Sequence, residues 1–103
     1  MPSSAEYKEF IDQALSLCDN ITYKKMMGEY LVYSNGVYFG AVCDDRFLVK
    51  IVAENEKYGF EKQLPYDGAK PMFAVDELDD KEFLAKVVSD TVLGLKRAER
   101  KNN

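Results

Sequence analysis

The stretch MMGEYLVYSNGVYFGAVCDDRFLVK, residues 26–50, decides the fold of this chain. At its centre is Asn35-Gly36, flanked on both sides by runs rich in β-branched and aromatic residues. Asn-Gly is the strongest short-range signal for a β-hairpin, because both central residues of its two-residue turn need a positive φ. Asp44-Asp45 stands where a second turn is expected. The stretch therefore predicts three antiparallel strands joined by two tight turns.

Two-residue turns would also fix which residues lie opposite each other. Tyr33 would pair with Tyr38 and Val32 with Phe39, and successive side chains of each strand would point to opposite faces of the sheet. One face is then predicted to be the core, with these side chains: Leu31, Tyr33, Tyr38, Val42, Phe47, Val49 and Ile51.

The opposite face is mixed, but Val32, Phe39 and Leu48 would form an apolar band across it. An antiparallel sheet that is solvated on one side should be more polar there. We therefore predict that this band is an interaction surface, covered by another element or by a protein partner. A second copy of the chain, giving a homodimer, is the simplest such partner.

Helical patterns flank the strands on both sides. An N-terminal apolar stripe follows Ser3, which is placed to cap a helix, and ends near Cys18. A second stripe follows Asp79, also placed as a cap, and runs to about Ala98. This order predicts an α+β fold, a two-layer sandwich of an antiparallel sheet with N- and C-terminal helices. The other predicted elements are a first strand or extended lead-in at residues 21–27, a helical turn at residues 53–60 and a short strand at residues 72–75.

Length and composition indicate one folded domain, residues 1–103, since domains usually contain about 100–150 residues. Hydrophobic residues make up 47% of the chain and charged residues 31%, a balance typical of soluble globular proteins. The sequence has neither a long apolar run nor a signal-peptide pattern, so we expect a cytoplasmic protein with no membrane partner. The net charge of −4 argues against broad binding to nucleic acid.

The chain contains no histidine, which removes the commonest general base and transition-metal ligand. Its two cysteines, Cys18 and Cys43, do not make a disulfide framework. Cys43 precedes Asp44-Asp45, and carboxylates oppose the thiolate form that a nucleophile needs. Lys50 is expected to be solvated or paired with a carboxylate rather than catalytic. We therefore predict no enzyme activity, no catalytic residue, no metal and no cofactor.

Two charged clusters have simple structural interpretations. Asp76, Glu77, Asp79 and Asp80 suit the N-terminus of a helix better than a metal site. The basic C-terminal cluster also suits a helix end, but it could contact phosphate. It makes a nucleic-acid-associated transcription cofactor the alternative function, with these contact residues: Lys96, Arg97, Arg100 and Lys101.

A third hypothesis is a small-ligand binder or enzyme that uses the tyrosines of the strands. Tyr30, Tyr33 and Tyr38 could line a pocket, although tyrosines in a small domain more often lie at the edge of its core. Only convergent polar groups in a pocket would favour this hypothesis.

A series of short motifs runs along the chain in this order: Met26-Met27-Gly28, Tyr30, Tyr33, Asn35-Gly36, Phe39, Phe47-Leu48-Val49-Lys50, Pro65-Tyr66 and Met72-Phe73. In order and spacing these motifs resemble the N-terminal domain of the TfoX/Sxy family, bacterial proteins linked to the regulation of natural competence. The resemblance covers roughly residues 10–95. Met27 stands where that family usually has Phe, and Glu29 where it usually has a second Gly.

The resemblance implies a two-layer α+β sandwich similar to the folds of type III secretion chaperones. It also implies a regulatory module without enzyme activity, which acts through protein contacts. Full-length competence regulators carry a second, helical domain, so this chain is expected to be a stand-alone copy of the first. The expected function is thus a non-enzymatic protein-interaction module.

Overall fold

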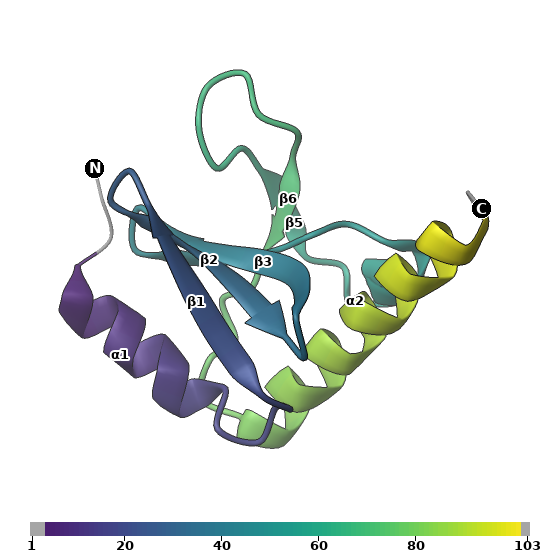
Figure 1. The fold of residues 1–103 in the computed structure, drawn as a ribbon, viewed down its shortest axis with the longest axis horizontal. Coiled ribbons are helices and arrows are strands. Elements are labelled where there is room, and N and C mark those ends of the chain that lie inside the picture. Colours follow the sequence, from purple (N-terminus) through teal and green to yellow (C-terminus); the bar gives the residue numbers. More distant parts are fainter. Residues whose placement is uncertain (1–3, 102–103) are drawn as a thin grey trace.

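The structure is a computed structural model, and it describes residues 4–101 with the exception of the Lys101 side chain. Its elements are α1 (Ala5–Ala14), β1 (Ile21–Met26), β2 (Glu29–Ser34), β3 (Val37–Cys43), β4 (Arg46–Val49), the 3₁₀ helix η1 (Ala53–Tyr58), β5 (Glu61–Gln63), β6 (Met72–Ala74) and α2 (Lys81–Lys101). All strands pair antiparallel in one sheet of order β1-β2-β3-β4-β6-β5 (Figure 1). The predicted α+β fold is confirmed, and β5 is an element that the sequence did not indicate.

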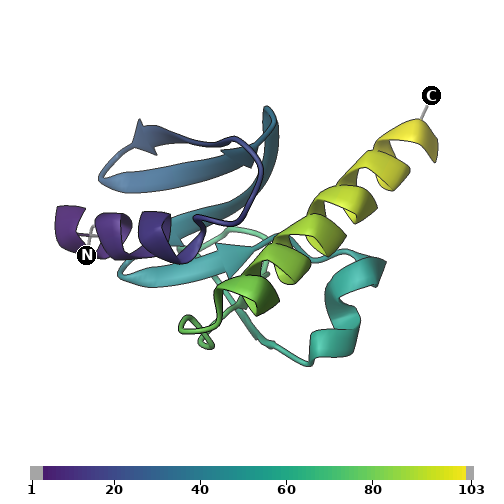
Figure 2. The same cartoon turned by 90° about the horizontal axis from the view of Figure 1, so that it is seen from below.

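The two long helices lie on the same face of the sheet, so the molecule has two layers (Figure 2). The main core fills the space between them and the sheet. Its fully buried side chains come from both layers: Ile11, Leu15, Val32, Phe39, Val42, Val49, Leu84 and Val87. Within residues 4–101, no helix is long and apolar enough to cross a membrane.

The helix caps lie one residue later than the sequence predicted. Ser4 caps α1, since its Oγ accepts a hydrogen bond of 3.1 Å from the backbone N–H of Tyr7. The predicted cap Ser3 lies outside the described residues. Asp80, not Asp79, caps α2, because its Oδ1 accepts a hydrogen bond of 3.0 Å from the N–H of Phe83.

The hairpin at Asn35-Gly36 forms as predicted, with Tyr33 opposite Tyr38. The predicted pairing of Val32 with Phe39 is wrong, because the register shifts by one residue and Val32 lies opposite Gly40. Phe39 is therefore the extra residue of a β-bulge. A Cβ atom on Gly40 would collide with the carbonyl oxygen of Leu48, so the strands can approach this closely only at a glycine.

The bulge changes which side chains lie on which face. Val32 and Phe39 join the core beneath the helices, although they were predicted on the other face. Leu31, predicted in the core, pairs with Ala41 on the face that the helices do not cover, and Tyr33 and Tyr38 lie on that face as well. The core positions predicted for Val42, Phe47 and Val49 are confirmed.

Candidate functional site on the uncovered face of the sheet

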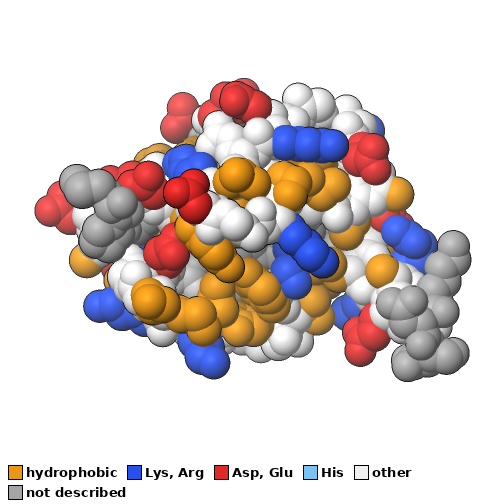
Figure 3. All heavy atoms as spheres, turned by 90° about the horizontal axis from the view of Figure 1, so that it is seen from above, with side chains coloured by type: hydrophobic (Ala, Val, Ile, Leu, Met, Phe, Trp, Pro, Cys, Tyr) orange, Lys and Arg blue, Asp and Glu red, His pale blue; other side chains and the backbone are white. Residues whose placement is uncertain are grey.

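The face of the sheet opposite the helices carries the candidate site. Figure 3 shows hydrophobic side chains gathered across this face, with Lys and Arg side chains among and beside them. The site rests on a small second core that is fully or almost fully buried: Ala41, Cys43, Leu48 and Met72. This layer is a rigid base for the side chains that surround it.

Two tyrosines on neighbouring strands lie on the same face of the sheet as this layer. The ring centroids of Tyr33 and Tyr38 are 5.6 Å apart, and their planes are inclined by 41°. Both side chains are half-buried, so each exposes part of its surface to solvent. The directly opposed positions of a hairpin bring the rings together.

Lys50 lies beside these rings, immediately after β4. Its Nζ is 3.9 Å from the ring centroid of Tyr38, a cation–π contact, and its backbone N–H donates a hydrogen bond of 2.8 Å to the carbonyl of Phe39. Burial lowers the pKa of Lys50, and the positive charge of nearby Lys70 lowers it further. Among the residues that the structure describes, no carboxylate lies within ion-pair distance of Lys50.

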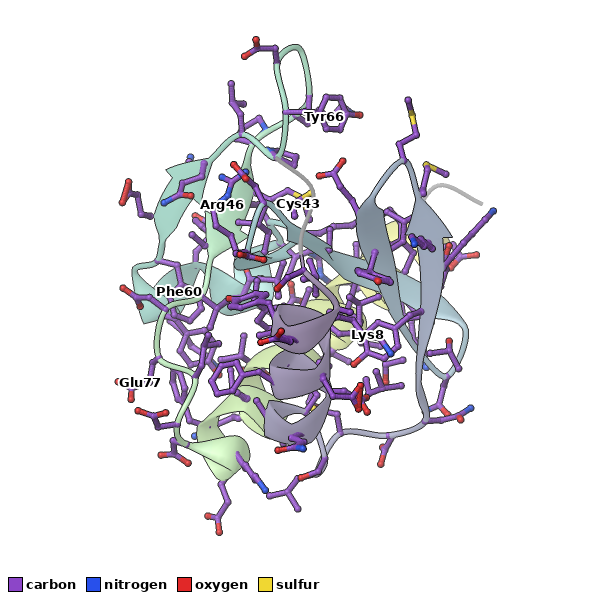
Figure 4. All side chains as sticks on the ribbon, turned by 90° about the vertical axis from the view of Figure 1, so that its left-hand side faces the viewer. Lys8, Cys43, Arg46, Phe60, Tyr66 and Glu77 are labelled. Carbon is purple, nitrogen blue, oxygen red and sulfur yellow. The ribbon has the colours of Figure 1, made fainter. Side chains whose placement is uncertain are left out.

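Arg46 holds the loop that borders the site, residues 64–71. One guanidinium nitrogen, Nη1, donates to Gln63 Oε1 at 2.9 Å and to the carbonyl of Leu64 at 3.1 Å, and Nη2 donates to the carbonyl of Pro65 at 3.2 Å. Figure 4 shows Tyr66 on this loop, at the same end of the sheet as Cys43 and Arg46. The loop exposes Leu64 and Tyr66 beside the sheet.

The thiol of Cys43 is not set up for nucleophilic chemistry. It donates a hydrogen bond to the carboxylate of Glu29. Burial raises the pKa of Cys43 to about 12, and the hydrogen bond to Glu29 and its negative charge contribute to the same shift. The thiol is therefore protonated at neutral pH.

The three residues predicted as an interaction surface do not lie together. Val32 and Phe39 belong to the core beneath the helices, and Leu48 lies under the uncovered face. Each has an exposed fraction of 0%. The band was predicted from a register without the bulge, and with the bulge it does not exist as a surface.

Lys96, Arg97 and Arg100 are exposed on α2, but Arg97 is already paired. Its Nε is 2.6 Å from Glu54 Oε2, and its Nη2 is 3.1 Å from Glu54 Oε1. Lys96 borders a groove between α2 and the α1–β1 connection. Arg100 is exposed, and the side chain of Lys101 lies outside the described part.

The three tyrosines predicted to line one pocket are also divided between two faces. Tyr30 packs against the helix-side core, whereas Tyr33 and Tyr38 lie on the uncovered face. In the described part of the chain, no three or more Cys, Asp or Glu side chains are grouped so that they could hold a metal ion.

Tyr66 and Lys70 are site residues that the sequence interpretation missed. They belong to the turn-rich loop between β5 and β6, strands that pair with each other. The dipeptide Asp67-Gly68 inside this loop was a usable hairpin signal. The residues before this turn do not predict a strand, because β5 is only three residues long and polar.

A comparison of the sequence with models of known protein families finds no match, and a comparison with curated proteins finds none either. The resemblance to the TfoX/Sxy domain therefore rests on the motifs of the sequence alone.

Proposed function

We propose that this chain is a non-enzymatic interaction module, related in role to the N-terminal domain of the TfoX/Sxy regulators, and that it binds a protein partner through the uncovered face of its sheet. One observation carries the proposal. Tyr33 and Tyr38 lie half-exposed beside Lys50 on a face that no helix covers within residues 4–101.

The chemistry of this face suits protein binding. Tyrosine is enriched at protein interfaces, since its ring supplies apolar area and its hydroxyl supplies a hydrogen bond. Exposed Leu64 and Tyr66 on the loop that borders the site add apolar area beside the sheet. The contacts of Tyr38 with Tyr33 and with Lys50 limit the movement of its ring, which lowers the entropy lost on binding.

The alternative, a nucleic-acid-associated cofactor that uses the end of α2, has less support. Arg97 is neutralised by Glu54, which leaves few free cations at that end. Affinity for nucleic acid grows with the number of phosphates that are neutralised. The net charge of −4 also opposes the approach of a polyanion.

Site-specific photo-crosslinking in the cells that express the protein tests the proposal. A benzophenone amino acid replaces Tyr38 on the uncovered face or, as the matched control, Leu93, which is 57% exposed on α2. We expect a covalent adduct with a protein from position 38 and none from position 93. Adducts from position 93 alone, or adducts from position 38 that nuclease removes, would contradict the proposal.

A further inference from the structure

The charges on the uncovered face are not balanced. Glu29 accepts a hydrogen bond from Cys43, and Arg46 is held by three acceptors of the adjoining segment. In the part of the chain that the structure describes, neither Lys50 nor Lys70 has an ion-pair partner. Lys50 and Lys70 are therefore two cations of the site that have no carboxylate within ion-pair distance in the described part of the chain.

Lys50 is the more informative of the two cations, because it is half-buried. A charge withdrawn from water without a counter-ion is unfavourable, and a carboxylate beside it relieves that cost. The ring of Tyr38 holds the ammonium group at 3.9 Å, so its position is already set before a ligand arrives. Hydroxyls of the neighbouring tyrosines can donate further hydrogen bonds to an anion.

From these contacts we infer that the partner segment is acidic, and that its carboxylates pair with Lys50 and Lys70 while its apolar side chains pack on Tyr33, Tyr38 and Tyr66. The inference rests on the proposed function and adds the chemistry of the partner. An extended segment suits the face best, because alternate side chains of such a segment point the same way.

Charge disfavours a second copy of the same face as the occupant. In a symmetric face-to-face dimer a residue at the two-fold axis meets its own copy, so an axis through Lys50 or Lys70 would place like charges opposite each other. The geometry also disfavours single-stranded nucleic acid. Bases stack on open aromatic faces, but the Lys50 ammonium covers one face of Tyr38, and Tyr33 is inclined to it by 41°.

Fluorescence anisotropy with the full chain tests the inference. The probe, called the Glu-Leu peptide, is a short fluorescein-labelled repeat of Glu-Ser-Leu-Ser, which places Glu and Leu on the same face of an extended chain. The matched probes replace Glu by Gln or by Lys. Labelled oligothymidylate is the nucleic-acid probe. We expect the Glu-Leu peptide to bind most tightly, and Lys50→Glu to weaken it by about tenfold or more.

Two further variants keep the result interpretable. Lys70→Glu changes an exposed residue of the same site, so it should weaken binding without affecting the fold. Lys96→Glu makes the same charge change on α2, away from the sheet face, and should leave the affinity within about twofold of the native chain.

The outcomes separate the inference from the proposed function. Equal binding of the Gln-Leu and Glu-Leu peptides, unchanged by Lys50→Glu, overturns the acidic preference and leaves the sheet face as a protein-binding surface. Failure of the Glu-Leu peptide to bind also overturns the inference, and crosslinking from position 38 then decides the proposed function by itself. If oligothymidylate binds the native chain and Lys50→Glu abolishes that binding, both the inference and the proposed function are overturned.

Discussion

The side-chain amide of Asn55 donates a hydrogen bond of 2.9 Å to the hydroxyl of Thr91, and both residues are fully buried. The same amide nitrogen donates to the carbonyl of Lys50 at 2.8 Å, and Asn55 Oδ1 accepts from the N–H of Val52 at 3.1 Å. Asn55 thus joins η1 to α2 and to the end of β4. This connection fixes the backbone of Lys50 at the edge of the candidate site.

Removing this amide should strongly destabilise the fold. Asn55→Ala leaves a buried N–H, a carbonyl and a hydroxyl without their partner, which should lower the free energy of unfolding by about 2–4 kcal/mol. Thr91→Val should cost about 1–3 kcal/mol for the same reason. Urea unfolding measures both, with the exposed Thr22→Val as the matched control. If Thr91→Val lowers the free energy of unfolding no more than Thr22→Val does, the buried hydrogen bonds of Asn55 and Thr91 do not stabilise the fold.

Gly94 should not tolerate alanine, although it lies inside α2. A Cβ atom there would lie 2.5 Å from Val52 Cγ2 and 2.6 Å from Glu54 Oε1. Helix propensity alone would favour alanine by about 1 kcal/mol, but the clash should reverse the sign and destabilise by about 1–3 kcal/mol. Ser89→Ala, an exposed position of the same helix, is the control and should be neutral or stabilising. Stabilisation by Gly94→Ala in thermal unfolding would contradict the close approach of η1 to α2.

Tyr58 should make the stability depend on pH in the alkaline range. Its hydroxyl donates a hydrogen bond of 2.5 Å to Asp90 Oδ2, and burial and this contact raise the pKa of Tyr58 to about 12. Because the pKa is higher in the folded state than the usual 10, the contribution is complete below about pH 10 and is lost as the pH rises towards 12. Urea unfolding measured from about pH 9 to about pH 11 should show a shallower decline in the free energy of unfolding for Tyr58→Phe than for the native chain. If the free energy of unfolding falls equally with pH in the native chain and in Tyr58→Phe, Tyr58 is not the cause of the decline.

The two thiols should alkylate slowly and at different rates. Burial raises the pKa of Cys43 to about 12 and that of half-buried Cys18 to about 11. Iodoacetamide near neutral pH, followed by mass spectrometry, should modify Cys18 before Cys43, because access and the thiolate fraction both favour Cys18. Glu29→Gln removes a negative charge beside Cys43 and should speed its reaction. Rapid alkylation of Cys43 in the native chain would contradict its hydrogen bond to Glu29.

The sequence predicted what depends on local signals. The Asn35-Gly36 turn and the apolar stripes of the two helices depend only on residues that are close in the sequence. The structure confirms the elements that these signals predict. The bulge at Phe39 was not predictable in this way. It depends on the close approach of Gly40 to the backbone of Leu48, a residue in the next strand.

The candidate site was harder to predict than the fold for the same physical reason. The register predicted from the sequence places Tyr38 on the core face and Lys50 on the opposite, mixed face. Their contact at 3.9 Å depends on the shift in register, which no local pattern indicates. The role of the loop at residues 64–71 depends on the pairing of β5 with β6, a short pairing that propensity does not specify.

The central claim is that the uncovered face of the sheet is the binding surface. Backbone amide chemical shifts, followed by NMR while the Glu-Leu peptide is added to the full chain, test this claim most directly. We predict that the shifted amides cluster on β2, β3 and β4 around Tyr33, Tyr38 and Lys50, and that the amide shift of Leu93 on α2 does not change. Shifts confined to the groove between α2 and the α1–β1 connection would contradict it.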